Sequence, residues 1–125
     1  MIKPRPVYLN LLQIRLPLPG WVSILHRISG FALTLVGIPV ALYALQRSLA
    51  SPESVSGLAA LGAQPLVKLV LLGLLWSLLH HLCAGIRYLL LDLDVGITLK
   101  PARSSSIVVL VASLALTVIL GVRLW

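Results

Sequence analysis

Charged side chains are scarce in this sequence of 125 residues. They make up 10% of the chain, with only three acidic residues, against about 25% in ordinary soluble domains. Apolar residues reach 59%, and a soluble protein of this length could not remove that much apolar surface from water. The composition therefore predicts one all-α membrane domain covering residues 1–125.

Cysteine is nearly absent, since Cys83 is the only one. No internal disulfide can form, and the chain lacks the cysteine cluster that an iron–sulfur centre needs. A basic stripe is also missing: the net charge is +7, but the basic residues are single and scattered. Nucleic acid is therefore not an expected partner. No apolar core with a small-residue cleavage site follows residues 1–6, so a signal peptide is not expected.

Three stretches carry no charge, namely residues 28–46, 69–86 and 104–122. Each would span about 27 Å or more as a helix, enough to cross the hydrocarbon core. We predict transmembrane helices over residues 21–49, 66–91 and 104–124, with Pro39 interrupting the first. The proline-rich segment 1–20 is expected on the inner membrane surface. Ser51 is expected to cap a short helix that Pro52 and Glu53 begin.

The distribution of basic residues predicts the orientation. An inner N-terminus and an outer C-terminus place seven basic residues inside and three outside, which agrees with the positive-inside rule. The inner set is Lys3, Arg5, Arg15, Arg27, Arg87, Lys100 and Arg103, and the outer set is Arg47, Lys68 and Arg123. Because no targeting segment is recognised, the expected location is a bacterial inner membrane.

Two polar clusters lie in the apolar segments. Ionisable groups at membrane depth are costly, so they raise a functional question. The first cluster contains Ser23, His26 and Arg27, and the second contains His80, His81, Arg87 and Asp92.

His81 is a candidate axial ligand of haem iron, because imidazole is a common haem ligand. Gly85, one helical turn later, would leave room for a porphyrin edge. His80 points about 100° away, so both cannot ligate one iron. By helical rise His81 lies about 9 Å deeper than Arg87, whereas His26 flanks a charged end. This difference in depth predicts that a second chain supplies the other ligand. A hydrogen-bonded structural histidine is the alternative.

The two arginines have two interpretations. Arg27 and Arg87 either snorkel to lipid headgroups or, with His26, neutralise haem propionates. Ser23, one turn from Arg27, could help to hold a quinone carbonyl. Asp92 could pair with Arg87, take part in proton uptake, or be a plain helix-end charge.

The sequence resembles the cytochrome b556 membrane-anchor family of succinate dehydrogenase. The first matching motif is Arg5-Pro6 followed by Ser23-Ile24-Leu25-His26-Arg27-Ile28-Ser29-Gly30, and the second is His81-Leu82-Cys83-Ala84-Gly85-Ile86-Arg87 with Asp92. Tyr88 departs from the usual histidine or phenylalanine, and Asp94 from a small residue.

This resemblance implies that His81 is an axial ligand of haem b, shared with a second hydrophobic anchor subunit. It implies that Ser23 and Arg27 line a ubiquinone site, and that His26 and Arg27 approach the haem propionates. The expected partners are the second anchor, an iron–sulfur subunit, a flavoprotein subunit and membrane lipid. Succinate would be oxidised on the flavoprotein, so no catalytic residue is expected in this chain.

Two alternatives remain open. The chain could belong to a quinol:fumarate reductase, or it could be a purely structural anchor without redox function. A transporter or channel subunit is disfavoured, because the polar groups gather in the inner half and the third span offers only serine and threonine.

Overall fold

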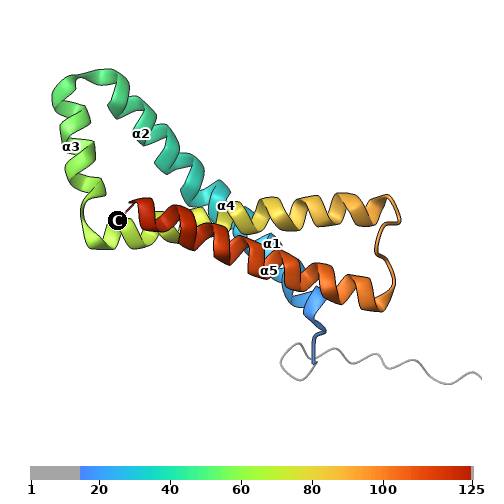
Figure 1. Cartoon of the computed structure of the whole chain (residues 1–125). Coiled ribbons are helices and arrows are strands. Elements are labelled where there is room, and N and C mark those ends of the chain that lie inside the picture. Colours follow the sequence, from blue (N-terminus) through green and yellow to red (C-terminus); the bar gives the residue numbers. More distant parts are fainter. Residues whose placement is uncertain (1–14, 125) are drawn as a thin grey trace, which may run out of the picture.

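The computed structural model describes residues 15–124, and these residues are organised as helices (Figure 1). Three helices are long and apolar enough to cross a membrane: Leu18–Ala50, Pro65–Asp92 and Leu99–Gly121. The prediction of an all-α fold with three spans is therefore confirmed. Most of the expected surface segment 1–20, including the Arg5-Pro6 pair, lies outside the described residues.

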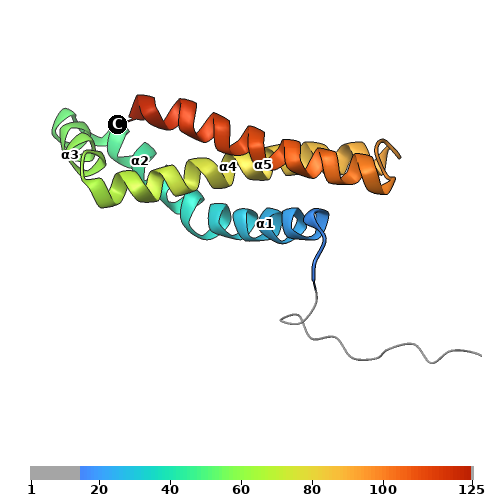
Figure 2. The ribbon, with the colours of Figure 1, turned by 60° about the horizontal axis from the view of Figure 1, so that its bottom comes forward.

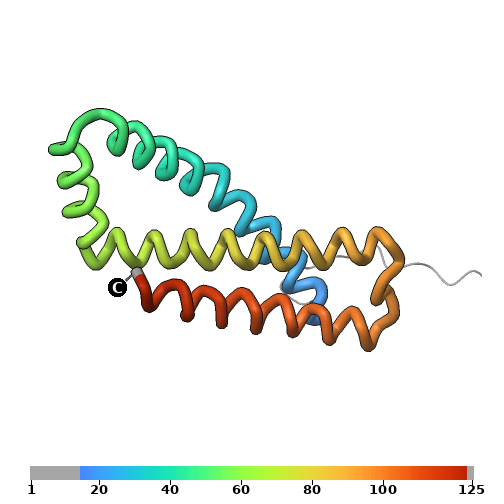
Figure 3. Tube along the Cα trace, turned by 45° about the horizontal axis from the view of Figure 1, so that its top comes forward, coloured from blue at the N-terminus to red at the C-terminus, as the bar shows by residue number. Residues whose placement is uncertain are grey.

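The first span is divided by a wide turn. It consists of α1 (Leu18–Ala32), a π-helical turn (Leu33–Gly37) and α2 (Ile38–Ala50). The amide of Ile38 donates to the carbonyl of Leu33, a π-type bond placed just before Pro39. Proline has no amide hydrogen, and its ring crowds the carbonyl four residues earlier, so a wider turn relieves the conflict. Beyond this turn α2 diverges from the other long helices (Figures 1 and 3).

A short helix, α3 (Pro52–Gly62), connects α2 to α4 (Pro65–Asp92). The Ser51 hydroxyl accepts a hydrogen bond from the Ser54 amide at 3.2 Å, so the predicted cap is confirmed. The pKa of the Glu53 carboxyl is lowered mainly by a hydrogen bond from the Glu53 backbone amide, and secondly by a hydrogen bond from the Ser51 side chain. A carboxylate in the first turn also interacts favourably with the positive end of the helix dipole.

The bundle core is formed where α1, α4 and α5 (Leu99–Gly121) pack together (Figure 2). The buried residues of α5 recur at steps of three and four and are small, as expected where membrane helices approach closely. They are Ser106, Val109, Ser113, Thr117 and Gly121, and α4, which packs against α5, buries Ser77, His80, Ala84 and Arg87. At Gly121 a Cβ would lie 2.6 Å from the Leu72 Cδ1 atom.

The α4–α5 loop closes α4 with a Schellman motif. The Val95 amide donates to the Leu90 carbonyl and the Asp94 amide donates to the Leu91 carbonyl, both at 3.0 Å. This motif requires a left-handed residue after the helix, and Asp94 adopts φ 59°. The backbone thus needs a residue that tolerates the left-handed region here, and aspartate is one of the non-glycine residues that do. Helix α5 then begins at Leu99, ahead of the predicted span start at residue 104, because Pro101 is acceptable in a first turn.

Candidate functional site

The two predicted clusters meet where α1 crosses α4. The rings of His26 and His81 stack with centroids 4.1 Å apart and planes 15° apart. The predicted difference in depth between them is therefore wrong. Helix α1 begins at Leu18, so His26 lies well inside the helix rather than at its charged end.

One ring nitrogen of His81 is hydrogen-bonded to α1. Its Nδ1 atom lies 3.0 Å from the His26 carbonyl oxygen and 3.2 Å from the Ser29 hydroxyl, which itself donates to the same carbonyl at 2.9 Å. A carbonyl oxygen only accepts, so we assign the hydrogen to Nδ1 of His81. The Nε2 atom of this neutral tautomer then carries a lone pair that can bind a metal.

Gly30 permits this approach of α1 to α4. A Cβ at position 30 would lie 2.8 Å from Cε1 of His81, closer than real Cβ contacts allow, and 3.2 Å from its Nδ1, which is a tight contact. At Gly85, in contrast, a Cβ would lie 3.9 Å from Nε2 of His26, which is an ordinary contact. Ser29 and Gly30 are thus residues of the histidine site, whereas the sequence interpretation had placed Gly30 only on the packing face of the first span and had given Ser29 no separate role. Their signal was their place in the first motif, three and four residues after His26.

We expect Gly30→Ala to reduce haem retention by the assembled complex by on the order of tenfold, as other changes behind a metal ligand do. The added methyl group must push the His81 ring away from the His26 carbonyl and disturb its orientation. The measurement is the ratio of haem to protein in the purified complex. Gly73→Ala is the matched control, because no atom lies within 4 Å of a Cβ there; an equal loss in that variant would refute a specific role for Gly30.

His80 is separated from this site. It is fully buried, and its ring stacks on Trp76 with centroids 5.2 Å apart. The Val22 carbonyl is near the ring, but neither ring nitrogen forms a hydrogen bond of standard geometry with the described residues. Because His81 is only half-buried, it is the histidine of the pair that a group shared with another chain can reach.

Tyr88 contributes an unpaired polar atom near the stacked histidines. Its ring centroid lies 5.2 Å from that of His26. The hydroxyl is buried and has no hydrogen-bond partner within residues 15–124. A buried hydroxyl without a partner costs about 1–3 kcal/mol, so this atom calls for a polar group from outside the described chain.

Ser23 and Arg27 lie one turn apart on α1. Ser23 is half-buried and Arg27 is exposed, although α1 packs against two helices. Their side chains are therefore available to groups outside the bundle. The structure places them on the helix that carries His26, as the sequence predicts.

Arg87 extends toward α5 rather than toward α1. It is 5% exposed, its Nε donates to the Ser105 hydroxyl at 2.9 Å, and its Nη2 donates to the Ala102 carbonyl at 3.3 Å. The hydrogen-bond acceptors of the guanidinium are thus on α5, and its Cζ atom also lies over the Tyr88 ring, 5.4 Å from the ring centroid. Asp92 is exposed at the end of α4. Within residues 15–124 the Tyr88 ring lies between Arg87 and His26, 5.4 Å from the Arg87 Cζ atom and 5.2 Å from the His26 ring centroid.

No three histidine, cysteine or acidic side chains within residues 15–124 converge as a metal site. Cys83 is free and half-buried, next to the core residues Val22, Ala84 and Val109. The described part of the chain thus offers single imidazole ligands rather than a complete protein-only metal site.

Comparison with known proteins identifies the family. The chain matches the family described as succinate dehydrogenase/fumarate reductase transmembrane subunit over residues 1–120. It is 39% identical to the succinate dehydrogenase cytochrome b556 subunit of Coxiella burnetii over 97% of both chains. It is 33% identical to the subunit of that name from Paracoccus denitrificans, over 92% of this chain and 88% of the relative. The resemblance inferred from the two motifs is confirmed, and the chain belongs to the family of succinate dehydrogenase/fumarate reductase transmembrane subunits.

Proposed function

We propose that this chain binds haem b through His81 and helps to form the ubiquinone-reduction site of a succinate dehydrogenase. The observation that carries the proposal is the hydrogen bond from Nδ1 of His81 to the His26 carbonyl at 3.0 Å. Metal-binding histidines almost always donate their second ring hydrogen to such an acceptor, which fixes the tautomer and orients the ring. The names of the relatives include cytochrome b556, which agrees with a b-type haem.

The residues around His81 fit a haem. The half-buried ring offers Nε2 as a ligand, and Gly30 and Gly85 add no side chain on either helix. The unpaired Tyr88 hydroxyl beside His26 could donate to a propionate. His26 and Arg27 are proposed to contribute to the same carboxylate contacts, since an arginine fork matches a carboxylate. When bound, haem supplies one-electron redox chemistry.

The second axial ligand is proposed to come from a second anchor subunit. The rings of His26 and His81 face each other, so they do not address one iron atom from opposite sides. His80 is enclosed by its own bundle. A haem between two subunits would satisfy both observations and would explain why His81 remains accessible.

Arg27 and Ser23 are proposed to hold the quinone. The hydroxyl and guanidinium can donate hydrogen bonds to a carbonyl oxygen, which becomes more basic as the quinone gains electrons. Reduction to quinol takes two electrons and two protons. The electrons would come from succinate by way of the flavoprotein and iron–sulfur subunits, because this chain has one cysteine.

The proposed setting is the inner membrane of a bacterium, with the N-terminus inside. The bacterial relatives and the bias of basic residues support this placement. Arg27, Arg87 and the α4–α5 loop would then face the side on which the soluble subunits dock.

A reduced-minus-oxidised visible spectrum of the purified complex tests the haem proposal. We expect a b-type band with about one haem per copy of this chain, as one axial imidazole per copy requires. A fully assembled complex without such a band would refute the haem assignment and leave a quinone-binding anchor that rests on Ser23 and Arg27.

Fumarate reduction is the second candidate function, because the matched family includes fumarate reductase subunits. Spacing in the sequence does not separate the two directions. The ratio of succinate oxidation to fumarate reduction, measured with ubiquinone and menaquinone analogues on one preparation, does.

A further inference from the structure

We propose that the pocket between α4 and α5 at their loop end binds an anionic phospholipid, whose phosphate pairs with Arg87 and whose acyl chain fills the pocket. This site lies on a different face of α4 from the histidine site, and it does not depend on haem.

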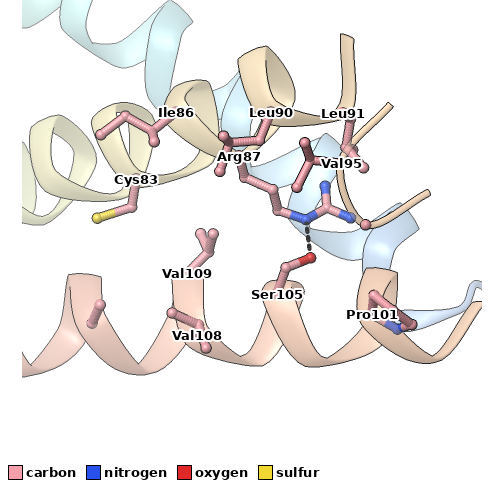
Figure 4. Close-up of a pocket in the computed structure, with 12 residues that line it drawn as sticks. Cys83, Ile86, Arg87, Leu90, Leu91, Val95, Pro101, Ser105, Val108 and Val109 are labelled. Atoms are coloured by element: carbon pink, nitrogen blue, oxygen red, sulfur yellow. Dashed lines mark hydrogen bonds between the residues drawn. The ribbon is translucent and has the colours of Figure 1, made fainter. Parts of the chain in front are cut away.

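The pocket has the size and lining of a small-ligand site. It has a volume of about 390 Å³, within the range of roughly 300–1,000 Å³ that is usual for such sites. Figure 4 shows Leu90, Val95, Val108 and Val109 around the side chain of Arg87. Apart from Arg87 and Ser105, the lining is almost entirely apolar, which suits a hydrocarbon chain.

The charge of Arg87 points to an anion. The guanidinium crosses from α4 to Ser105 (Figure 4) and is 5% exposed. Within residues 15–124 its contacts are the Ser105 hydroxyl, the Ala102 carbonyl and the Tyr88 ring, 5.4 Å from Cζ, and none of them carries a negative charge. They orient the fork but do not neutralise it. A buried charge without a counter-charge is costly, and a phosphate would remove that cost by a charge-assisted hydrogen bond.

The depth of Arg87 agrees with a lipid headgroup. Helix α4 has 28 residues, about 42 Å at 1.5 Å per residue, against about 30 Å for the hydrocarbon core. Each end would thus project by about 6 Å, and Arg87 lies about 7.5 Å before Asp92. The guanidinium is therefore near the hydrocarbon boundary, where phosphates lie. Basic pockets between membrane helices are a known form of anionic-lipid site.

The loop that closes the pocket is held in place by the Schellman motif. Leu90 and Val95 are joined by one of its hydrogen bonds, and both line the pocket together with Gly96 and Pro101. The end wall is thus built by the backbone geometry of the loop, so the cavity is formed before a ligand arrives.

The test measures lipid retained by the assembled complex in nanodiscs, using native mass spectrometry with phosphatidylglycerol or phosphatidylcholine as the probe. We expect retention of phosphatidylglycerol by the wild type to exceed that of phosphatidylcholine, and to fall at least about tenfold in Arg87→Gln, since a charged hydrogen bond contributes about 1.5–3 kcal/mol and each 1.4 kcal/mol is about tenfold in binding. Ala112→Leu, which fills the pocket without changing a charge, should reduce retention similarly.

Arg103→Gln is the matched control, because Arg103 is an exposed basic residue on the first turns of α5. The Arg103→Gln variant should retain as much phosphatidylglycerol as the wild type does. Wild-type levels of phosphatidylglycerol retention in both Arg87→Gln and Ala112→Leu would overturn the proposal. Equal retention of phosphatidylglycerol and phosphatidylcholine by the wild type would also overturn it. So would the absence of retained lipid in the wild type, as expected if a side chain of a partner subunit fills the pocket.

Discussion

His81→Ala is expected to remove most of the b-type band from the assembled complex. Its Nε2 is the proposed ligand, and its Nδ1 is fixed by the His26 carbonyl. Loss of a residue that only orients a ligand costs about 10–100-fold in metal affinity, so loss of the ligand itself should cost at least as much. The measurement is the reduced-minus-oxidised spectrum, normalised to the amount of assembled complex.

His80→Leu is the matched control for His81→Ala. It removes an imidazole from the adjacent position, but one that is fully buried and whose nitrogens form no hydrogen bond of standard geometry within residues 15–124. We expect the haem band to be unchanged, and thermal stability to be equal to that of the wild type or higher, because an unsatisfied buried polar group is removed. A band that is lost in His80→Leu and kept in His81→Ala would reverse the assignment of the ligand.

The sequence was sufficient for the fold because the signals there are local. Uncharged stretches of the right length predict spans, and Ser51-Pro52-Glu53 predicts a helix start through its own chemistry. These features do not depend on which helix packs against which. The left-handed conformation of Asp94 belongs to the same class, although the sequence pattern only marked that position as unusual.

The sequence predicted that the two clusters face each other but placed them at the wrong depths, and the binding roles of their residues remain predictions. Equating the positions of Arg27 and Arg87 along the membrane placed His26 and His81 at different depths, whereas their rings are stacked. That error arose because charge positions report where a chain meets water, not how two helices are offset. Gly30 shows the same limit. Its importance lies in its short distance to the His81 ring on another helix, and the spacing of residues along one helix does not predict that distance.

Arg87 illustrates a competition that sequence alone leaves undecided. The interpretations open from sequence were the headgroups, a haem propionate and Asp92. The structure instead provides Ser105 and Ala102, on the helix that follows the loop. The haem contact predicted for Arg87 remains a prediction, and its partners on α5 now favour the lipid site.

Arg27→Ala should lower quinone reduction by about 10–100-fold while the rate of succinate oxidation with a soluble artificial acceptor is kept. A hydrogen bond from a charged donor contributes about 1.5–3 kcal/mol, and each 1.4 kcal/mol is about tenfold in rate. Ser23→Ala should have a smaller effect of about fivefold, since a neutral hydrogen bond contributes about 1 kcal/mol. Both rates are measured on the same complex, and their ratio cancels differences in assembly.

Arg47→Ala and Ser48→Ala are the controls for this pair, because they remove the same chemical groups from the opposite end of the first span. Both residues are exposed, and the Ser48 hydroxyl donates a hydrogen bond within its own helix, to the Leu45 carbonyl. Their ratio of quinone to artificial-acceptor activity should match that of the wild type. If Arg27→Ala lowers the two activities equally in a fully assembled complex, its role is in subunit docking rather than at the quinone. A ratio that falls only in Arg27→Ala and Ser23→Ala would locate quinone reduction at this end of α1, since the controls change the same groups and leave that end untouched.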